Sequence, residues 1–339
     1  MSVYILGGSR TPQGSFLGSL ASVSAPKLGA IAIEGAIEKA GITKDQVNEV
    51  FMGNVVQAGV GQAPARQATI FSGLSESVPA TTINKVCGSG LQSIIFGART
   101  IETGENKVVV AGGMENMSLA PHLLPNSRSG YKFGETKITD SMAYDGLRDV
   151  YTDRPMGNCA EECTRKFEMT REEQDAFSIE SFKRAQKAQA DGIFASEISA
   201  VTIKGRKGDT VVDSDEGPGK VKFDKVSTLR PAFEKDGTIT AANASTINDG
   251  AAAIILGGAD FKDQAKFKIH SWGGHAQNPT WFTTAPVEAI KKNLEKSRLK
   301  VSDIGLWEIN EAFACVAMAA MKELDIPHDK VNIYGGGVS

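Results

Sequence analysis

The sequence predicts a layered α/β protein, and three observations favour this class. Apolar patterns typical of helices and of strands alternate through the first third of the 339 residues. The segment 108–111 is short and wholly apolar, as in a strand that is buried on both faces. Part of the first pattern recurs near residue 285, which indicates an internal duplication. Because helices separate the strands, we expect parallel pairing in the sheet.

The elements of the first third follow in a regular order. The expected order is a helix over 26–40 ending at Gly41, a strand over 47–52, a helix over 64–72, a strand over 80–86, a helix over 88–104 and the buried strand at 108–111. The duplication rests on the order Ala25-Pro26, helix, Asp45, apolar strand and Asn54. This order returns as Ala285-Pro286, helix, Asp303, a strand over 306–309 and Asn310.

The middle of the chain has a different residue pattern. Pro121, Pro125, Gly130 and Gly134 punctuate a polar stretch that looks like an inserted loop region. Two helices are expected after it, over 159–167 and 171–191, and Thr170-Arg171-Glu172-Glu173 has the pattern of a capping box for the second helix. The segment 204–225 is charged and rich in glycine, as a mobile surface would be, and 254–256 has the character of a buried strand.

The composition is that of a soluble globular protein. Apolar residues make up 41% and charged residues 23% of the chain, and the net charge is −3, which argues against a general nucleic-acid binder. No apolar run is long enough to span a bilayer, and no leader pattern precedes the first expected strand. The four cysteines form neither a C-x-x-C pair nor a zinc spacing, so we expect a reducing compartment and no metal site.

Cys87 is the sharpest local signal. It follows the expected strand 80–86, and glycines open the helix behind it. The N-terminus of a helix favours a thiolate, and its free N–H groups can stabilise an oxyanion. A buried structural cysteine explains the local pattern about equally well, because free cysteines are among the most buried residues.

Five segments resemble the motifs of the thiolase family, and they occur in the family's order. They are G-N-V-V-Q-A-G-V-G-Q-A-P-A-R-Q at 53–67, N-K-V-C-G-S-G at 84–90, A-G-G-M-E-N-M-S at 111–118, A-N-A-S-T-I-N-D-G-A-A-A at 242–253 and N-E-A-F at 310–313. Ala160-Glu161-Glu162 and the segment 307–311 are similar to the short-chain acetyl-CoA acetyltransferase branch.

The resemblance implies a five-layer α-β-α-β-α fold made of two duplicated βαβαβαββ halves with an inserted loop domain. The first half is expected over 1–116, completed by 248–268, the loop domain over 117–247, and an incomplete second half over 269–339. It also implies a homotetramer, a dimer of dimers, in which 121–140 is the tetramerisation loop.

The implied reaction is the reversible Claisen condensation of two acetyl-CoA molecules to acetoacetyl-CoA and CoA through an acyl-cysteine. A longer-chain 3-ketoacyl-CoA thiolase and a non-catalytic acyl-CoA-binding protein are the alternatives. Coenzyme A is part of the substrate, and no separate cofactor is implied. The family's potassium site uses a tyrosine near Gly217-Pro218-Gly219-Lys220, and no tyrosine stands there, so we do not expect that site.

The resemblance also assigns roles to single residues. Cys87 is acylated, and Asn310 holds a water that helps to bind the thioester oxygen of the second substrate. Contacts with the acyl-CoA are implied for Met156, Lys220, Ala244, Ser245 and Phe313. Ser245 and Asn310 also fit turn or cap positions, and Phe313 fits a plain core position. Pro155 replaces a histidine that many short-chain thiolases have, which leaves the acyl preference open.

Two catalytic segments of the family, G-H-P-x-G and C-x-G-G-G, come after the position of Ser339. They supply the histidine that activates the nucleophile and the cysteine that moves the α-proton. None of the histidines at 122, 270, 275 and 328 follows that pattern, and His275, between glycines, is the one tempting substitute. We therefore expect a polypeptide that ends at Ser339 to lack carbon–carbon bond formation. The expected location is the cytoplasm, with the mitochondrial matrix or peroxisome as alternatives.

Overall fold

The computed structural model describes residues 2–339, which form two compact units. The first consists of the described residues up to Leu147 together with Glu197–Glu216 and Ile247–Ile269. The second consists of Arg148–Ser196, Gly217–Thr246 and His270–Ser339. The domain ranges expected above follow the duplicated halves of the family, whereas these units are defined by compactness. Those ranges therefore stay a prediction.

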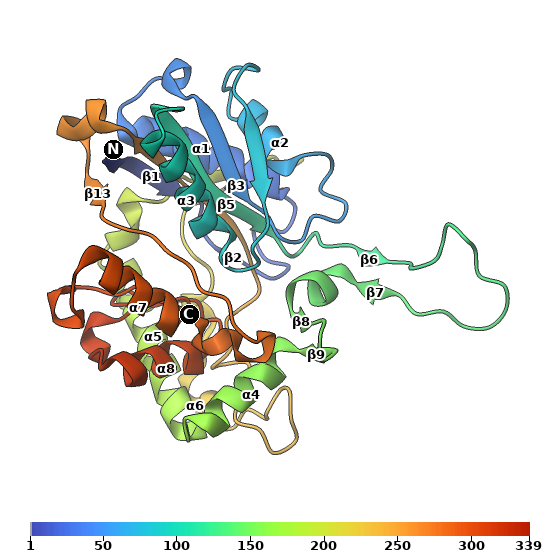
Figure 1. Ribbon diagram of the computed structural model, residues 1–339. Coiled ribbons are helices and arrows are strands. Elements are labelled where there is room, and N and C mark those ends of the chain that lie inside the picture. The colour runs from blue at the N-terminus through green and yellow to red at the C-terminus, as the bar shows by residue number, and fades with distance from the viewer. Residues whose placement is uncertain (1) are drawn as a thin grey trace. The chain divides into compact units, whose positions relative to one another are not determined.

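A seven-stranded mixed sheet is the centre of the first unit (Figure 1). Its strands are β1 (Val3–Arg10), β2 (Gly14–Ser15), β3 (Glu49–Gly53), β4 (Ala80–Ile83), β5 (Val108–Asn116), β12 (Asn248–Gly257) and β13 (Phe267–Ile269). The order is β13-β1-β12-β5-β3-β4, and β2 pairs with β12. The helices of this unit are α1 (Ala25–Ala40), α2 (Pro64–Phe71) and α3 (Ser89–Glu102).

The expectation of parallel pairing is right for only part of this sheet. β3 is parallel to β4 and to β5, and a helix connects each pair of strands consecutive in the chain, as parallel pairing requires. β12 is antiparallel to both β1 and β5. Long segments, rather than one crossover helix, connect β12 to the preceding strand of the sheet. The connection therefore does not require β12 to be parallel to its neighbours.

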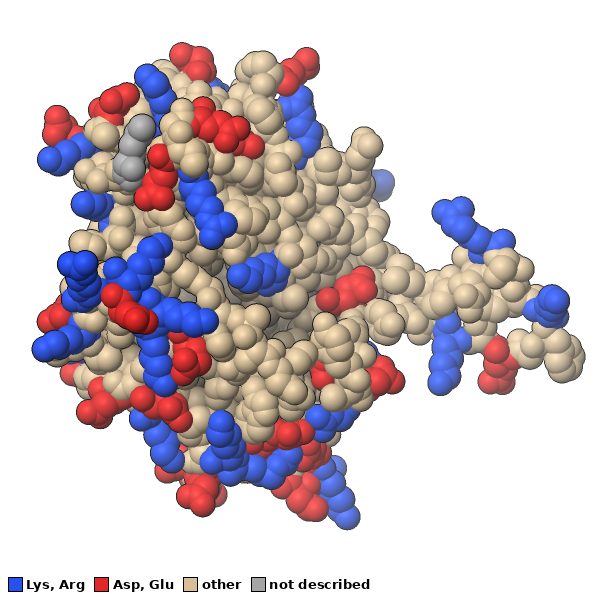
Figure 2. All heavy atoms as spheres, in the orientation of Figure 1, with Lys and Arg blue, Asp and Glu red and all other residues tan. Residues whose placement is uncertain are grey.

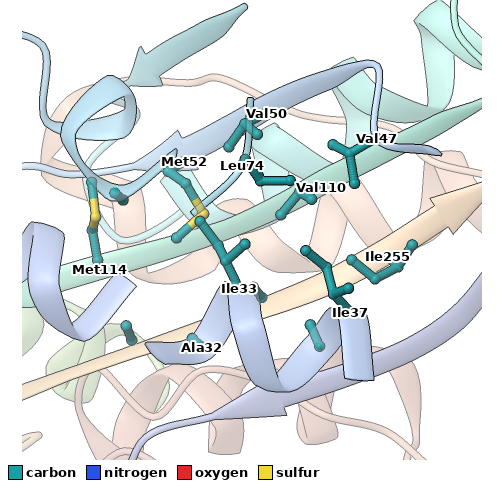
Figure 3. Packing of buried hydrophobic residues seen from close by; sticks show 14 of the residues in the cluster. Ala32, Ile33, Ile37, Val47, Val50, Met52, Leu74, Val110, Met114 and Ile255 are labelled. Atoms are coloured by element: carbon teal, nitrogen blue, oxygen red, sulfur yellow. The ribbon is translucent and has the colours of Figure 1, made fainter. Parts of the chain in front are cut away.

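The core of the first unit lies between α1 and the sheet (Figure 3). Ile33 and Ile37 of α1 point towards Met52 of β3, Val110 of β5 and Ile255 of β12. These side chains are 5% exposed or less. Burying a residue of this size contributes about 1.5–3 kcal/mol, so this contact stabilises the sheet strongly.

A long hairpin arm leaves the first unit (Figure 1). β6 (His122–Leu123) and β7 (Thr139–Asp140) form its base, and the segment between them contains no strand. Leu124, Tyr131, Phe133 and Ile138 expose apolar side chains there. The π-helical turn Met142–Gly146 and the hairpin of β10 (Val201–Ile203) and β11 (Thr210–Val212) complete the unit, together with the 3-10 turns Lys44–Gln46 and Ala259–Gln264.

The second unit is largely helical. It contains β8 (Arg148–Asp149), β9 (Arg154–Pro155), α4 (Met156–Lys166), α5 (Arg171–Ala190), α6 (Phe223–Val226), α7 (Ala285–Ser297) and α8 (Ala314–Leu324), with 3-10 turns at Ile193–Ser196, Pro218–Lys220, Pro279–Thr284, Val301–Asp303 and His328–Lys330. The capping box at the start of α5 is confirmed: the Glu173 N–H donates to Thr170 Oγ1 at 3.1 Å, and the Glu173 carboxylate accepts from the Thr170 N–H.

The strand expected over 306–309 is wrong. Its backbone makes only an isolated parallel bridge, between Trp307 and Val331. A strand needs several consecutive residues of a neighbouring strand to pair with. In the described part of the second unit, no such neighbouring strand lies beside this segment.

The surface carries both signs of charge. In Figure 2, Lys and Arg are interspersed with Asp and Glu over the face in view. This fits the small net charge of −3. Within residues 2–339, none of the helices combines the length and the apolar character that crossing a membrane demands.

Candidate active site

Cys87 lies in a tight turn between β4, which ends at Ile83, and α3, which begins at Ser89. The Ser89 hydroxyl organises the turn: it donates to the Val86 carbonyl at 2.6 Å and accepts from the Lys85 N–H at 2.8 Å. Val86 has φ +47°, a left-handed conformation that is unusual for a β-branched residue. The turn therefore holds Cys87 in one place at the carboxyl end of the parallel strands.

The Cys87 side chain reaches solvent, but protein atoms surround much of its sulfur. Desolvation raises the pKa of the thiol, and its own backbone N–H only partly offsets this. This direction is opposite to the one that a helix N-terminus alone favours. The first N–H groups of the turn are already used, because Gly88 donates to Lys85 O and Ser89 to Val86 O.

Glycines bring the start of α3 close to the sheet. A methyl group on Gly53 of β3 would lie 2.6 Å from Ser89 Cβ. A methyl group on Gly90 would meet the backbone of Gly112 and Gly113 of β5 at 3.8 Å, an ordinary contact, so this part of α3 also lies close to the sheet. The turn that carries Cys87 is thus fixed by backbone packing as well as by hydrogen bonds.

A half-buried carboxylate supports the same turn from behind. Glu115 accepts from the Val55 N–H and from Asn54 Nδ2, both at 2.8 Å, and burial raises its pKa. The Val55 carbonyl accepts from Asn84 Nδ2 at 3.4 Å, and Asn84 Oδ1 accepts from the Val86 N–H at 3.0 Å. Glu115, Asn54 and Asn84 lie within the motifs named above, which assign them no role. A glutamate within an apolar strand was the available signal.

The second unit gathers several of the residues expected to contact acyl-CoA. Phe313 is 8% exposed, and its ring lies 6.0 Å from that of Phe233 and 6.4 Å from that of Phe282. Met156 and Ala244 pack, half-buried, on the same apolar cluster. Three of the predicted residues thus share one cluster, although the core explanation of Phe313 is equally compatible with its burial.

Two motif segments pair directly by backbone hydrogen bonds. The Ser245 N–H donates to Ala312 O at 3.0 Å, and the Ala314 N–H donates to Asn243 O at 2.8 Å. This brings Ala244 opposite Phe313 and leaves the Ser245 side chain exposed.

The remaining predicted residues are on the surface of the second unit. Asn310 is exposed, and its Oδ1 lies 3.3 Å from where a methyl group on Gly337 would be. Lys220 is exposed at the end of the turn Pro218–Lys220, outside the Phe313 cluster.

His275 is occupied by other contacts. Lys292 Nζ lies 2.9 Å from its Nδ1 and Gln277 Oε1 lies 3.1 Å from its Nε2. A lysine ammonium only donates, so Nδ1 accepts and Nε2 donates to Gln277. Both ring nitrogens are therefore engaged. His328 stacks on Phe177 at 5.0 Å, and burial lowers its pKa.

The other three cysteines, Cys159, Cys163 and Cys315, are buried. Within residues 2–339, no three His, Cys, Asp or Glu side chains are grouped so that they could hold a metal ion.

Comparison with family models decides what kind of protein this is. The model of the thiolase N-terminal domain matches residues 3–260, and that of the thiolase C-terminal domain matches residues 263–339. The chain belongs to the thiolase family. The thiolase fold expected from the sequence motifs is thereby confirmed, with a solved relative as further evidence.

That relative is the Acat5 thiolase of Ascaris suum, whose crystal structure is in complex with coenzyme A. It superimposes with a TM-score of 0.94 at 41% identity, over 100% of this thiolase and 88% of its own chain. The mitochondrial acetyl-CoA acetyltransferase of Rattus norvegicus is 49% identical over 343 residues, 99% of this chain and 80% of its own. The mitochondrial acetyl-CoA acetyltransferase erg10A of Aspergillus fumigatus is 47% identical over 344 residues, 99% of this chain and 79% of its own.

Proposed function

We propose that this thiolase is an acetyl-CoA C-acetyltransferase in which Cys87 carries the acetyl group. The observation that supports this most directly is the placement of Cys87: a solvent-reaching thiol, fixed by the Ser89 hydroxyl, where a strand meets a helix. The acetyl-CoA acetyltransferases of Rattus norvegicus and Aspergillus fumigatus, similar over 99% of the chain, support the acetyl substrate.

The proposed reaction has two steps. The Cys87 sulfur attacks the carbonyl carbon of acetyl-CoA, CoA leaves, and the acetyl thioester of Cys87 forms. A second acetyl-CoA then loses an α-proton to a base, and its α-carbon attacks the acetyl carbonyl. The Cys87 sulfur leaves and acetoacetyl-CoA forms. Because burial raises the pKa of the Cys87 thiol, its attack needs a base that takes the thiol proton.

The remaining roles are proposed on the same footing. Met156 and Phe313 line the path of the acyl group and pantetheine arm, Ala244 and Ser245 contact the pantetheine, and Lys220 lies near the adenine. The apolar cluster around Phe313 suits the pantetheine chain, which is mostly uncharged. Asn310, with an exposed amide, suits a water-mediated contact with the second thioester.

The first test is to map the acetyl group. After incubation of the complete protein with acetyl-CoA, proteolysis and mass spectrometry are expected to place one acetyl thioester on Cys87. The protein with Cys87→Ala should take up none, because the buried thiols of Cys159 and Cys315 lack access to the substrate. Acetyl on either of these with Cys87 unmodified would refute the proposal.

We also propose a homotetramer whose dimers meet through the arm that spans 121–140. Phe133 is fully exposed and Ile138 is 64% exposed, which is unusual for apolar side chains on a surface that has no partner. Replacing Phe133 and Ile138 together by serine is expected to convert tetramers into dimers, as measured by light scattering. The matched control is Val211→Ser, an exposed apolar residue of β11 outside the arm. A monomeric parent protein, or tetramers unaffected by the double change, would contradict this.

The cytoplasm remains the proposed location, with the mitochondrial matrix as the alternative that the names of two relatives suggest. Subcellular fractionation with an antibody against the protein separates the two.

A further inference from the structure

The side chain of Asn332 continues a pairing that the backbone starts. The Trp307 N–H donates to Lys330 O at 2.8 Å, and the Asn332 N–H donates to Trp307 O at 2.9 Å. At Ile309, two residues after Trp307, the side-chain amide of Asn332 makes the hydrogen bonds that a neighbouring strand would make. Its Oδ1 accepts from the Ile309 N–H and its Nδ2 donates to Ile309 O, both at 2.8 Å. Asn332 has φ +47°, which asparagine tolerates better than most residues.

The same amide reaches a buried carboxylate. Asn332 Nδ2 donates to Glu311 Oε1 at 2.8 Å. Glu311 Oε2 accepts from Ser181 Oγ at 2.8 Å and from the Val338 N–H at 3.2 Å. Glu311 is 0% exposed, and all three of these donors are neutral. Removing any of them leaves a buried carboxyl group with fewer hydrogen bonds, so the arrangement is strongly fixed.

Asn310 lies between the two residues that Asn332 holds. Ile309 precedes it and Glu311 follows it, so its backbone is fixed on both sides. Among residues 2–339, its own side chain has no hydrogen-bond partner and is exposed. Gly336 packs closely on this carboxylate, since a methyl group on Gly336 would lie 2.3 Å from the Glu311 carboxyl carbon.

We propose that Asn332 and Glu311 are positioning residues that set the Asn310 amide for the second acetyl-CoA. This rests on the proposed function, in which Asn310 acts in carbon–carbon bond formation but not in the acetyl uptake by Cys87. Within residues 2–339 no hydrogen bond holds the Asn310 side chain, so its placement depends on the backbone that the Asn332 amide and the Glu311 carboxylate fix.

The two half-reactions separate positioning from stability. In the complete protein, Asn332→Asp keeps the size and the acceptor for Ile309 but removes both donated hydrogen bonds and sets a carboxylate against Glu311. We expect acetoacetyl-CoA formation to fall about 100-fold, the cost of a shift of about 1 Å in a reacting group. Acetyl exchange between acetyl-CoA and labelled CoA, which needs Cys87 but not the second acetyl-CoA, should stay within about three-fold of the parent, since the positioning effect falls on the other step.

Glu311→Gln is the second variant, and it is expected to show a smaller loss of the same step only, because glutamine still offers Asn332 an acceptor. It decides the matter alone if Asn332→Asp does not fold. The matched control is Asn293→Asp on α7, whose side chain contacts Ala289 O and Ser271, and both reactions should match the parent. Equal losses in the two reactions, or no loss in either, would overturn the positioning role while the parent enzyme stays active. A parent protein without either reaction would overturn the proposed function, and this inference with it.

Discussion

Gly53→Ala is expected to slow acetyl transfer at Cys87 about 100-fold. The added methyl group would lie 2.6 Å from Ser89 Cβ, 2.8 Å from Ser89 C and 2.9 Å from Gly90 N. Real contacts of this kind are nearer 3.5–4 Å, and two of the three atoms belong to the backbone. β3 is hydrogen-bonded to strands on both sides, so the start of α3 has to move by about 1 Å, and Cys87 moves with it.

Acetylation of Cys87 by acetyl-CoA, followed by intact mass against time, measures this effect. Gly258→Ala in the same unit is the matched control, because a methyl group there meets Ile101 at 3.5 Å, an ordinary contact. Circular dichroism separates a displaced turn from an unfolded protein, since overpacking also costs about 1–3 kcal/mol of stability. A folded Gly53→Ala protein with the parent rate would show that the packing of α3 does not set the position of the thiol.

Elements with local determinants were predictable from the sequence. α1 is preceded by Ser24, contains Pro26 in its first turn and ends at Gly41 with φ +66°, close to the limits expected from these residues. α5 begins at the predicted capping box. Helix ends depend on a few adjacent side chains, which a single sequence displays.

Features that depend on distant partners were not predictable in this way. The antiparallel direction of β12 depends on how a segment far along the chain enters the sheet. The pKa of Cys87 depends on the atoms packed around the sulfur, whereas its place beside a helix suggested the opposite direction. The segment 306–309 has a strand-like sequence, but the side chain of Asn332 supplies the pairing at Ile309.

The candidate site shows the same division. Motifs placed Cys87 in a strand-to-helix turn and brought Ala244 and Phe313 into one cluster of the second unit. They did not reveal that Glu115, half-buried, and Glu311, fully buried, would be the carboxylate acceptors behind these segments. A buried carboxylate is recognised from its surroundings, and those come from residues that are remote in sequence.

Glu161→Ala is expected to lower the free energy of unfolding by about 4 kcal/mol. Glu161 is 1% exposed, and its carboxylate accepts from the N–H groups of Thr238 and Ile239 at 2.8 Å and from the Thr238 hydroxyl at 3.1 Å. The alanine leaves the buried Ile239 N–H and the half-buried Thr238 N–H without their acceptor and creates a cavity beside Gly237, which packs on the carboxylate. The segment that Glu161 fixes runs on into Ala242–Ser245.

Urea denaturation of the parent and variants measures the loss. Glu162→Ala is the matched control. The Glu162 carboxylate is about a third exposed and contacts Arg154 at 2.9 Å, and exposed ion pairs contribute little to stability. Glu161→Gln keeps the volume but replaces one acceptor oxygen by a donor that faces an N–H group, so its loss should lie between those of the two alanine variants. If Glu161→Gln is as stable as the parent while Glu161→Ala is not, the second carboxylate oxygen contributes little, and the loss in alanine comes from the lost volume and from the two bonds that an amide oxygen still accepts.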